Sequence, residues 1–327
     1  METWIIRLHD STNETAFLAI NALIAVIFCF WLIPTTTDMM VNSAAGLAGK
    51  YLGKDQRTIV INCSTNNPEL FLMLVSLCIR RLGGIATPLG SNFANIYLMF
   101  IVAPIIVISK WIFAGKISEI KNFINIFNQE KRLFLWHLSM SLLMFGFSSI
   151  AFWCITGTSV FSRLPEGTKT RTVPWIFVGS LICFIAVLVF SFYEKQFKVK
   201  RPELFEDISE DDYTESWWQF ILGTALLVLL CYILNTLFIA LTGIYDDVLS
   251  QLFGYAIFAG LHYFFGSLIS SLPETIVAVK NYERLTSPDL NTAMASASQS
   301  NMTNLAIGLL GSVVAGFLLV IGFNYQL

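Results

Sequence analysis

Eight long apolar runs restrict what this chain can fold into. They cover residues 17–48, 56–82, 84–109, 133–156, 174–193, 217–243, 249–280 and 289–323. A helix needs roughly 20 apolar residues to cross a bilayer, and each run is long enough. With 55% hydrophobic and 13% charged residues, the composition is far from that of a soluble globular domain. The sequence therefore predicts an all-α integral membrane protein, built as a multi-span helix bundle.

The basic residues predict how the chain is oriented. Of the 20 Lys and Arg residues, fourteen fall in the alternate connections that lie inside if the amino end lies outside. Cytoplasmic connections carry an excess of Lys and Arg, so both termini are expected on the non-cytoplasmic side of a plasma membrane or an endomembrane. The lipid bilayer is thus an expected partner, whereas nucleic acid is not, because the sequence has no dense basic patch.

A charged link divides the chain into two membrane halves. The first half is residues 1–193, the link is 194–216 and the second half is 217–327. The same count of basic residues makes the link cytoplasmic. Its acidic stretch from Glu206 to Asp212 lacks the glycine and the ligand spacing of an EF-hand loop, so a solvated linker is the favoured interpretation.

A pair of short polar motifs occurs once in each half. Each copy has small polar residues followed by Pro-Glu, and about two dozen positions later Ser-Asn-x-x-Asn. The copies read "STNNPEL" and "GSNFAN" within about 58–108, and "SSLPET" and "SQSNMTN" within about 260–312. The common order indicates an internal duplication. The Pro-Glu motifs lie on the second and seventh runs, five crossings apart, so the second copy is predicted to be inverted. Inverted repeats with interrupted helices point to a transporter site near the bilayer midplane.

The two motifs carry chemistry suited to a cation. Pro68 and Pro273 remove backbone donors and free carbonyls in residues 62–65 and 267–270. A freed carbonyl in hydrocarbon is costly unless something binds it, and hard cations prefer oxygen ligands. Glu69 and Glu274 would supply the charge, although a carboxylate in mid-span costs on the order of 2.5–3.5 kcal/mol on insertion scales. The candidate ligands are Glu69, Glu274, Thr65, Asn66, Ser91, Asn95, Ser270, Ser271, Ser300 and Asn304.

These residues resemble the two alpha repeats of the cation/calcium exchanger superfamily. Its usual forms are Gly-Thr-Ser-x-Pro-Glu and Gly-Ser-Asn-x-x-Asn or Asp, and the likeness covers most of the chain. The resemblance implies exchange of Ca²⁺ for Na⁺, protons or K⁺ by alternating access, with Na⁺ the first expectation and no resident cofactor. It also implies that Glu69 and Glu274 are the central calcium carboxylates and that the other candidates are ligands around them.

The chain departs from the family pattern in four places. Asn66 replaces a serine, Asn304 stands where some sodium-coupled members have aspartate, and "SASQSN" lacks the usual glycines. The family pattern also has about ten spans, against the eight runs counted here. The shorter second half leaves open an oligomer or a partner chain, and with it a non-transporting subunit as an alternative function.

An enzyme is not expected. His137 and His262 are isolated from any metal-binding spacing, so packing or a hydrogen bond within the bundle is the favoured role for each. No GxSxG nucleophile motif occurs either. The six cysteines suggest neither a disulfide framework nor a CxxC metal site.

Overall fold

The computed structural model of the protein describes residues 2–53, 56–78, 83–157, 159, 173–205, 213–245, 247–248, 251 and 269–323. All regular secondary structure in these residues is helical. Six helices among them are long and apolar enough to cross a membrane: Glu14–Tyr51, Thr87–Phe113, Lys131–Thr156, Val173–Lys200, Trp217–Phe238 and Ser287–Val320. The predicted all-α fold with several membrane-spanning helices is confirmed to that extent.

The two remaining apolar runs contain the Pro-Glu motifs and are not continuous helices. Run 56–82 is split into α4 (Arg57–Thr65) and α5 (Asn67–Cys78). In run 249–280 the described part is mainly α14 (Leu272–Glu283), and His262 and Ser267 lie outside the described residues. The interruption predicted from Pro68 and Pro273 is therefore present in both motifs.

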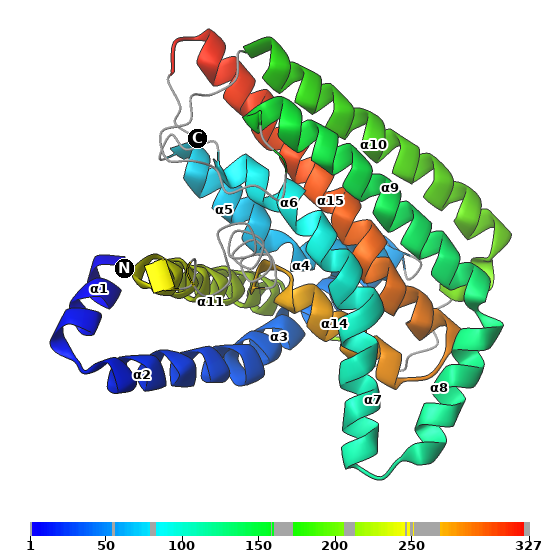
Figure 1. The fold of residues 1–327 in the computed structure, drawn as a ribbon. Helices are drawn as coiled ribbons and strands as arrows, with labels where there is room; N and C mark the ends of the chain where they lie inside the picture. The colour runs from blue at the N-terminus through cyan, green and yellow to red at the C-terminus, as the bar shows by residue number, and fades with distance from the viewer. Residues whose placement is uncertain are drawn as a thin grey trace.

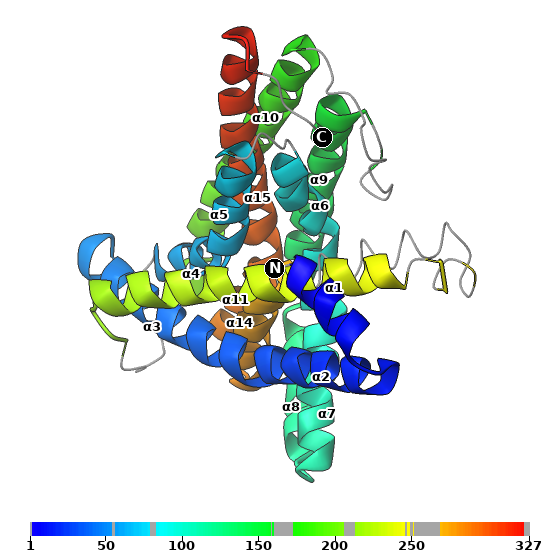
Figure 2. The ribbon, with the colours of Figure 1, turned by 90° about the vertical axis from the view of Figure 1, so that its left-hand side faces the viewer.

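The helices form two groups that cross each other. In the first group α6 (Gly83–Tyr97), α9 (Lys131–Thr156) and α10 (Val173–Lys200) pack along α15 (Ser287–Val320), as Figure 1 shows. In the second group α3 (Ile33–Tyr51) runs beside α11 (Trp217–Ile244), and both cross the first group (Figure 2). Helix α2 (Glu14–Ile27) leads into α3 and diverges from α11 (Figure 1). Separate apolar cores fill each group, and α14 lies between them.

Two prolines explain local widening of otherwise straight spans. The π-helical turns η1 (Phe28–Leu32) and η3 (Leu98–Val102) directly precede α3 and α7 (Ala103–Phe113), which both carry Pro at their start. Pro34 and Pro104 have no N–H, and their rings would clash with the carbonyl four residues earlier. An extra residue in the preceding turn relieves that clash and lets each helix continue through its proline.

Three of the basic connections predicted on the inner side meet at one end of the molecule. Lys110 at the end of α7 bonds Glu283 at the end of α14, with Nζ and Oε1 2.6 Å apart. Arg201, just after α10, bonds Glu130 between α8 (Ile117–Gln129) and α9 at 3.1 Å. These contacts place three of the predicted inner connections on a common face, while the side of the membrane stays a prediction.

Two segments predicted as connections are helical. The stretch between the third and fourth runs forms α8, which buries Phe123 in the core beside α7 and α14. Helix α10 continues through Lys200, so the start of the predicted linker at 194 is part of that helix. The Glu194 side chain is buried rather than solvated. The hydrophobic pattern of the sequence could not predict the burial of Glu194, because its hydrogen-bond partner, Gln299, lies on a distant segment.

The contact between α3 and α11 depends on a glycine. A Cβ at Gly223 would lie 3.0 Å from Met40 N and 3.1 Å from Met40 Cα, so the two backbones would have to separate. We expect Gly223→Ala to lower the free energy of unfolding by about 1–3 kcal/mol, the usual cost of overpacking. Thermal unfolding in detergent measures this. Gly243→Ala on the same helix is the control, because nothing lies within 4 Å of its Cβ and alanine favours helix. Equal melting temperatures for the two variants would contradict the close approach.

Candidate cation site

The two helix breaks have matching geometry. In the first motif the break is at Asn66, with φ −83° and ψ 7°, and in the second it is at Ser271, with φ −96° and ψ 11°. Each residue stands two positions before its proline and three before its glutamate. The next helix starts in the same way in both, because Leu70 N bonds Asn66 O and Thr275 N bonds Ser271 O, each at 3.1 Å. The two motifs that resemble each other in sequence thus also share the backbone conformation at their breaks.

The two glutamates of these motifs are buried and interact with each other. Glu69 and Glu274 are each 1% exposed, one turn beyond the breaks, and each lies within electrostatic reach of the other. Ser270 hydrogen-bonds the Glu69 carboxylate, and Thr65, its equivalent in the first motif, lies beside the Glu274 carboxylate. Two like charges held together in a protein interior repel unless a cation or a proton balances them.

Three asparagines among the candidate ligands direct their amide nitrogens toward protein acceptors. Asn66 Nδ2 donates to Asn62 O at 2.8 Å and to Ser300 Oγ at 3.1 Å. Asn95 Nδ2 donates to the Asn301 side chain at 3.0 Å. Asn304 Nδ2 donates to Ser91 Oγ at 3.0 Å and to Asn92 Oδ1 at 2.9 Å. The nitrogen of each amide is held by these bonds, and the oxygen at its other end has no hydrogen-bond partner.

Helices α6 and α15 are joined by a reciprocal asparagine pair at their Ser-Asn-x-x-Asn motifs. Asn92 Nδ2 donates to Asn301 O at 3.2 Å, and Asn301 Nδ2 donates to Asn92 O at 3.0 Å. These residues hold the same position in the two copies, so the exchange is what a local two-fold relation would produce. Neither was among the predicted ligands, although both lie inside the predicted motif. The sequence does not reveal such a pair, because the partner of each side chain is a backbone oxygen, which every residue has.

The structure buries all ten predicted site residues. None is more than 7% exposed, and they come from α4, α5, α6, α14 and α15 and the breaks between them. However, not all ten have an oxygen without a hydrogen-bond partner. Ser91 Oγ bonds Pro88 O and accepts from Asn304, and Ser300 Oγ accepts from Asn66, so these two hydroxyls already support the asparagines. Thr65 Oγ1 bonds Asn62 O at 2.9 Å.

The buried side-chain oxygens that lack a hydrogen-bond partner concentrate in these motifs. Within the described part of the chain they include both oxygens of Glu274 and one of Glu69, together with Asn66 Oδ1, Asn95 Oδ1, Asn304 Oδ1 and Ser271 Oγ. Most buried polar atoms in proteins are paired, and each exception requires an explanation. Nearly all of these atoms are acceptors, which fits a cation and does not fit an anion.

The donor set determines which cations the motifs fit. Two carboxylates with amide and hydroxyl oxygens are the ligands of Ca²⁺, which takes six to eight oxygens in flexible geometry. Among the described residues no group of three or more His, Cys, Asp or Glu could hold a metal, so a zinc-type site has no support there. The residues fit a hard cation with two acidic ligands.

Two findings differ from the expectations about ligands. The carbonyl of Asn62, predicted to be freed by Pro68, accepts from Thr65 Oγ1 and Asn66 Nδ2. Side-chain donors therefore satisfy one of the backbone carbonyls that the proline was predicted to leave without a partner. Conversely, Thr37 on α3 has a buried hydroxyl oxygen without a partner, although the sequence offered no reason to select it from the run Thr35–Thr37.

His137 has the bundle role favoured from the sequence. Its Nδ1 lies 2.8 Å from Ser298 Oγ and its Nε2 lies 2.9 Å from Asn291 Oδ1, so it joins α9 to α15. Asn291 Nδ2 in turn bonds the carbonyl of Leu204 within the link. Both ring nitrogens are thus occupied by neutral partners of α15.

Comparison of the chain with protein-family models, with curated proteins and with solved structures finds no match.

Proposed function

We propose that the protein is a cation antiporter that exchanges Ca²⁺ for a monovalent cation, with Na⁺ as the counter-ion expected first. The observation that carries the proposal is the set of unpaired buried oxygens in the two Pro-Glu motifs, which have equivalent helix breaks, and in the two Ser-Asn-x-x-Asn motifs. Leaving such oxygens without partners costs free energy, and a dehydrated cation would recover it. The resemblance of the motifs to the cation/calcium exchangers agrees with this proposal.

The charge of the site suits alternate occupancy. Two carboxylates balance one divalent cation, and they also balance two monovalent cations or protons. The site has a similar net charge with one Ca²⁺ or with two monovalent cations, whereas the two carboxylates repel each other when no cation is bound. A conformational change that carries the site across the membrane is therefore favoured only when cations are bound. That condition is what coupled exchange requires.

The second helix group provides the moving part in this proposal. Helices α3 and α11 cross the break-bearing helices, and α11 contacts the first break through Thr224, whose hydroxyl lies 3.3 Å from Asn67 Nδ2. A surface pocket of about 350 Å³ beside α4 is lined by residues that include Ser64 and Asn67. We propose that a shift of α3 and α11 exposes the site to one side and then the other, with the two copies inverted in the membrane.

Uptake measurements test the proposed exchange. Purified protein in vesicles with an outward Na⁺ gradient should accumulate radiolabelled Ca²⁺, and uptake should stop when the gradient is collapsed. Proton and K⁺ gradients are run in parallel. If only a proton or a K⁺ gradient drives uptake, that ion and not Na⁺ is the counter-ion. Absence of uptake with every gradient would contradict the antiporter and favour a subunit that needs a partner chain.

A further inference from the structure

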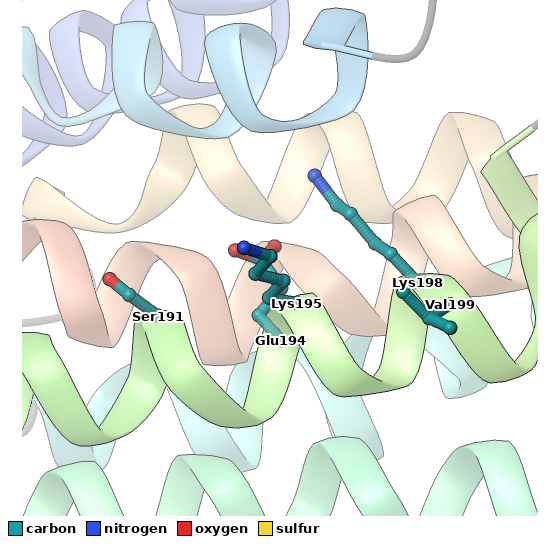
Figure 3. Close-up of a pocket in the computed structure, with 5 residues that line it drawn as sticks. All are labelled: Ser191, Glu194, Lys195, Lys198 and Val199. Atoms are coloured by element: carbon teal, nitrogen blue, oxygen red, sulfur yellow. The ribbon is translucent and has the colours of Figure 1, made fainter.

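Glu194 is a buried carboxylate outside the candidate cation site. It lies near the inner end of α10 and is 8% exposed. A surface pocket of about 380 Å³ beside it is lined by Ser191, Glu194, Lys195, Lys198 and Val199. Figure 3 shows these residues along one stretch of α10, with α15 behind them. The Glu194 side chain thus borders a surface pocket on one side and contacts Gln299 inside the bundle on the other.

A continuous line of hydrogen bonds connects Glu194 with the first helix break. Gln299 Nε2 on α15 donates to Glu194 Oε1 at 2.7 Å. Gln299 Oε1 accepts from Asn62 Nδ2 on α4 at 2.8 Å. The backbone oxygen of Asn62 then accepts from Asn66 Nδ2 at 2.8 Å. Three helices that are distant in sequence are therefore linked by one buried polar chain that ends at a candidate cation ligand.

The carboxylate at the start fixes the direction of the Gln299 and Asn62 amides. An ionised carboxylate only accepts hydrogen bonds, so Gln299 must turn its nitrogen toward Glu194 and its oxygen toward Asn62. Asn62 must then direct its nitrogen to Gln299, and its Oδ1 accepts from Ser296 Oγ at 3.0 Å. Gln299 and Ser296 both lie on α15, so these two bonds hold the last turn of α4, with the backbone oxygen that accepts from Asn66, against α15.

The orientation of Asn66 matters to a cation. Asn66 Nδ2 donates both to Asn62 O on α4 and to Ser300 Oγ on α15, so the position of this side chain depends on how α4 sits against α15. A shift between these helices would move Asn66 Oδ1, the buried oxygen without a partner, away from the position in which it can bind a cation. Without a carboxylate at the start, Gln299 and Asn62 would each have two amide orientations of similar energy.

We propose that Glu194 is a positioning residue for the cation site, acting through Gln299 and Asn62 on the amide of Asn66. This inference rests on the proposed function, because it names a residue that sets the affinity of the same site. Residues that orient metal ligands typically change metal affinity by about 10–100-fold when they are altered. Glu194 does so from a different helix and without touching the cation.

Four variants test the positioning role by Ca²⁺ uptake into vesicles. Glu194→Gln and Gln299→Met should each raise the KM for Ca²⁺ by about tenfold, with kcat within about twofold. The double variant Glu194→Gln/Gln299→Met should be no worse than either single change, since both break one chain. The exchanged pair Glu194→Gln/Gln299→Glu should restore KM to within about threefold, because the carboxylate introduced at position 299 would again accept from Asn62. Glu203→Gln, which alters an exposed glutamate bound to Arg201, is the matched control.

Each outcome decides for or against the positioning role. An unchanged KM in Glu194→Gln, KM effects that multiply in the double variant, or an exchanged pair as weak as the single variants would overturn it while uptake by the unaltered protein stands. Melting temperatures in chelator separate a folding defect from a change in affinity, since the proposal expects them to stay close to that of the unaltered protein. If the unaltered protein neither takes up Ca²⁺ nor melts higher when Ca²⁺ is added, the proposed function fails, and this inference fails with it.

Discussion

Replacing Glu274 by glutamine should reduce Ca²⁺ uptake by at least ~100-fold, more than the loss expected from an outer residue of a metal site. Both carboxylate oxygens of Glu274 are buried without a hydrogen-bond partner, so both are available to a cation. Glu69→Gln should have a similar effect on uptake. Glu69 differs in that Ser270 already bonds its carboxylate.

The same substitution should raise stability when no cation is bound. In chelator, at a pH that ionises both carboxylates, the unaltered protein must hold two buried like charges close together, and Glu274→Gln removes one of them. We therefore expect the variant to melt at a higher temperature than the unaltered protein in chelator, and to lose the rise in melting temperature that Ca²⁺ gives the unaltered protein. Opposite signs for transport and stability are not expected of a purely structural glutamate.

A second glutamate of α14 provides the control for this experiment. Glu283 is partly exposed and bonds Lys110 at the end of α7. Glu283→Gln should leave uptake unchanged and alter stability by less than about 1 kcal/mol, as is usual for an exposed ion pair. If Glu274→Gln transported Ca²⁺ normally, or if its melting temperature still rose with Ca²⁺, Glu274 would not be a ligand.

Replacing Asn301 by aspartate should prevent the bundle from folding. Asn301 Nδ2 lies 3.0 Å from Asn92 O and 3.2 Å from Ser141 O, two backbone acceptors that cannot donate. A carboxylate oxygen there would face both carbonyls inside a fully buried contact between α6, α9 and α15. Breaking a buried network in this way costs about 3–5 kcal/mol, a large share of the stability of a domain. Loss of the monodisperse peak in detergent gel filtration measures the effect.

Asn281→Asp is the matched control for Asn301→Asp. Asn281 is only partly buried, and its amide bonds Val277 O within its own helix. We expect this variant to elute as the unaltered protein does. A monodisperse, thermally stable Asn301→Asp protein would show that the α6–α15 contact does not depend on the reciprocal asparagines.

Local features of the sequence were enough to predict much of the candidate site. Proline disrupts a helix wherever it occurs in its interior, so Pro68 and Pro273 predicted both interruptions, and the repeated spacing directed attention to Glu69 and Glu274. The same reasoning did not find Asn92 and Asn301, because their partners are each other's backbone groups. It also assigned Glu194 to a solvated link, since a charged residue at the end of an apolar run is usually exposed.

The sequence by itself determined the helical class, the apolar spans and the positions of the two breaks, because these depend on composition and on residues that are close together in the chain. Only the tertiary structure decided which oxygens are free. Asn66 meets Ser300, Asn304 meets Ser91 and Asn62 meets Gln299, each pair more than 200 positions apart in the chain. An amide can present either end to a cation, and which end it presents is set by the partner that occupies the other end.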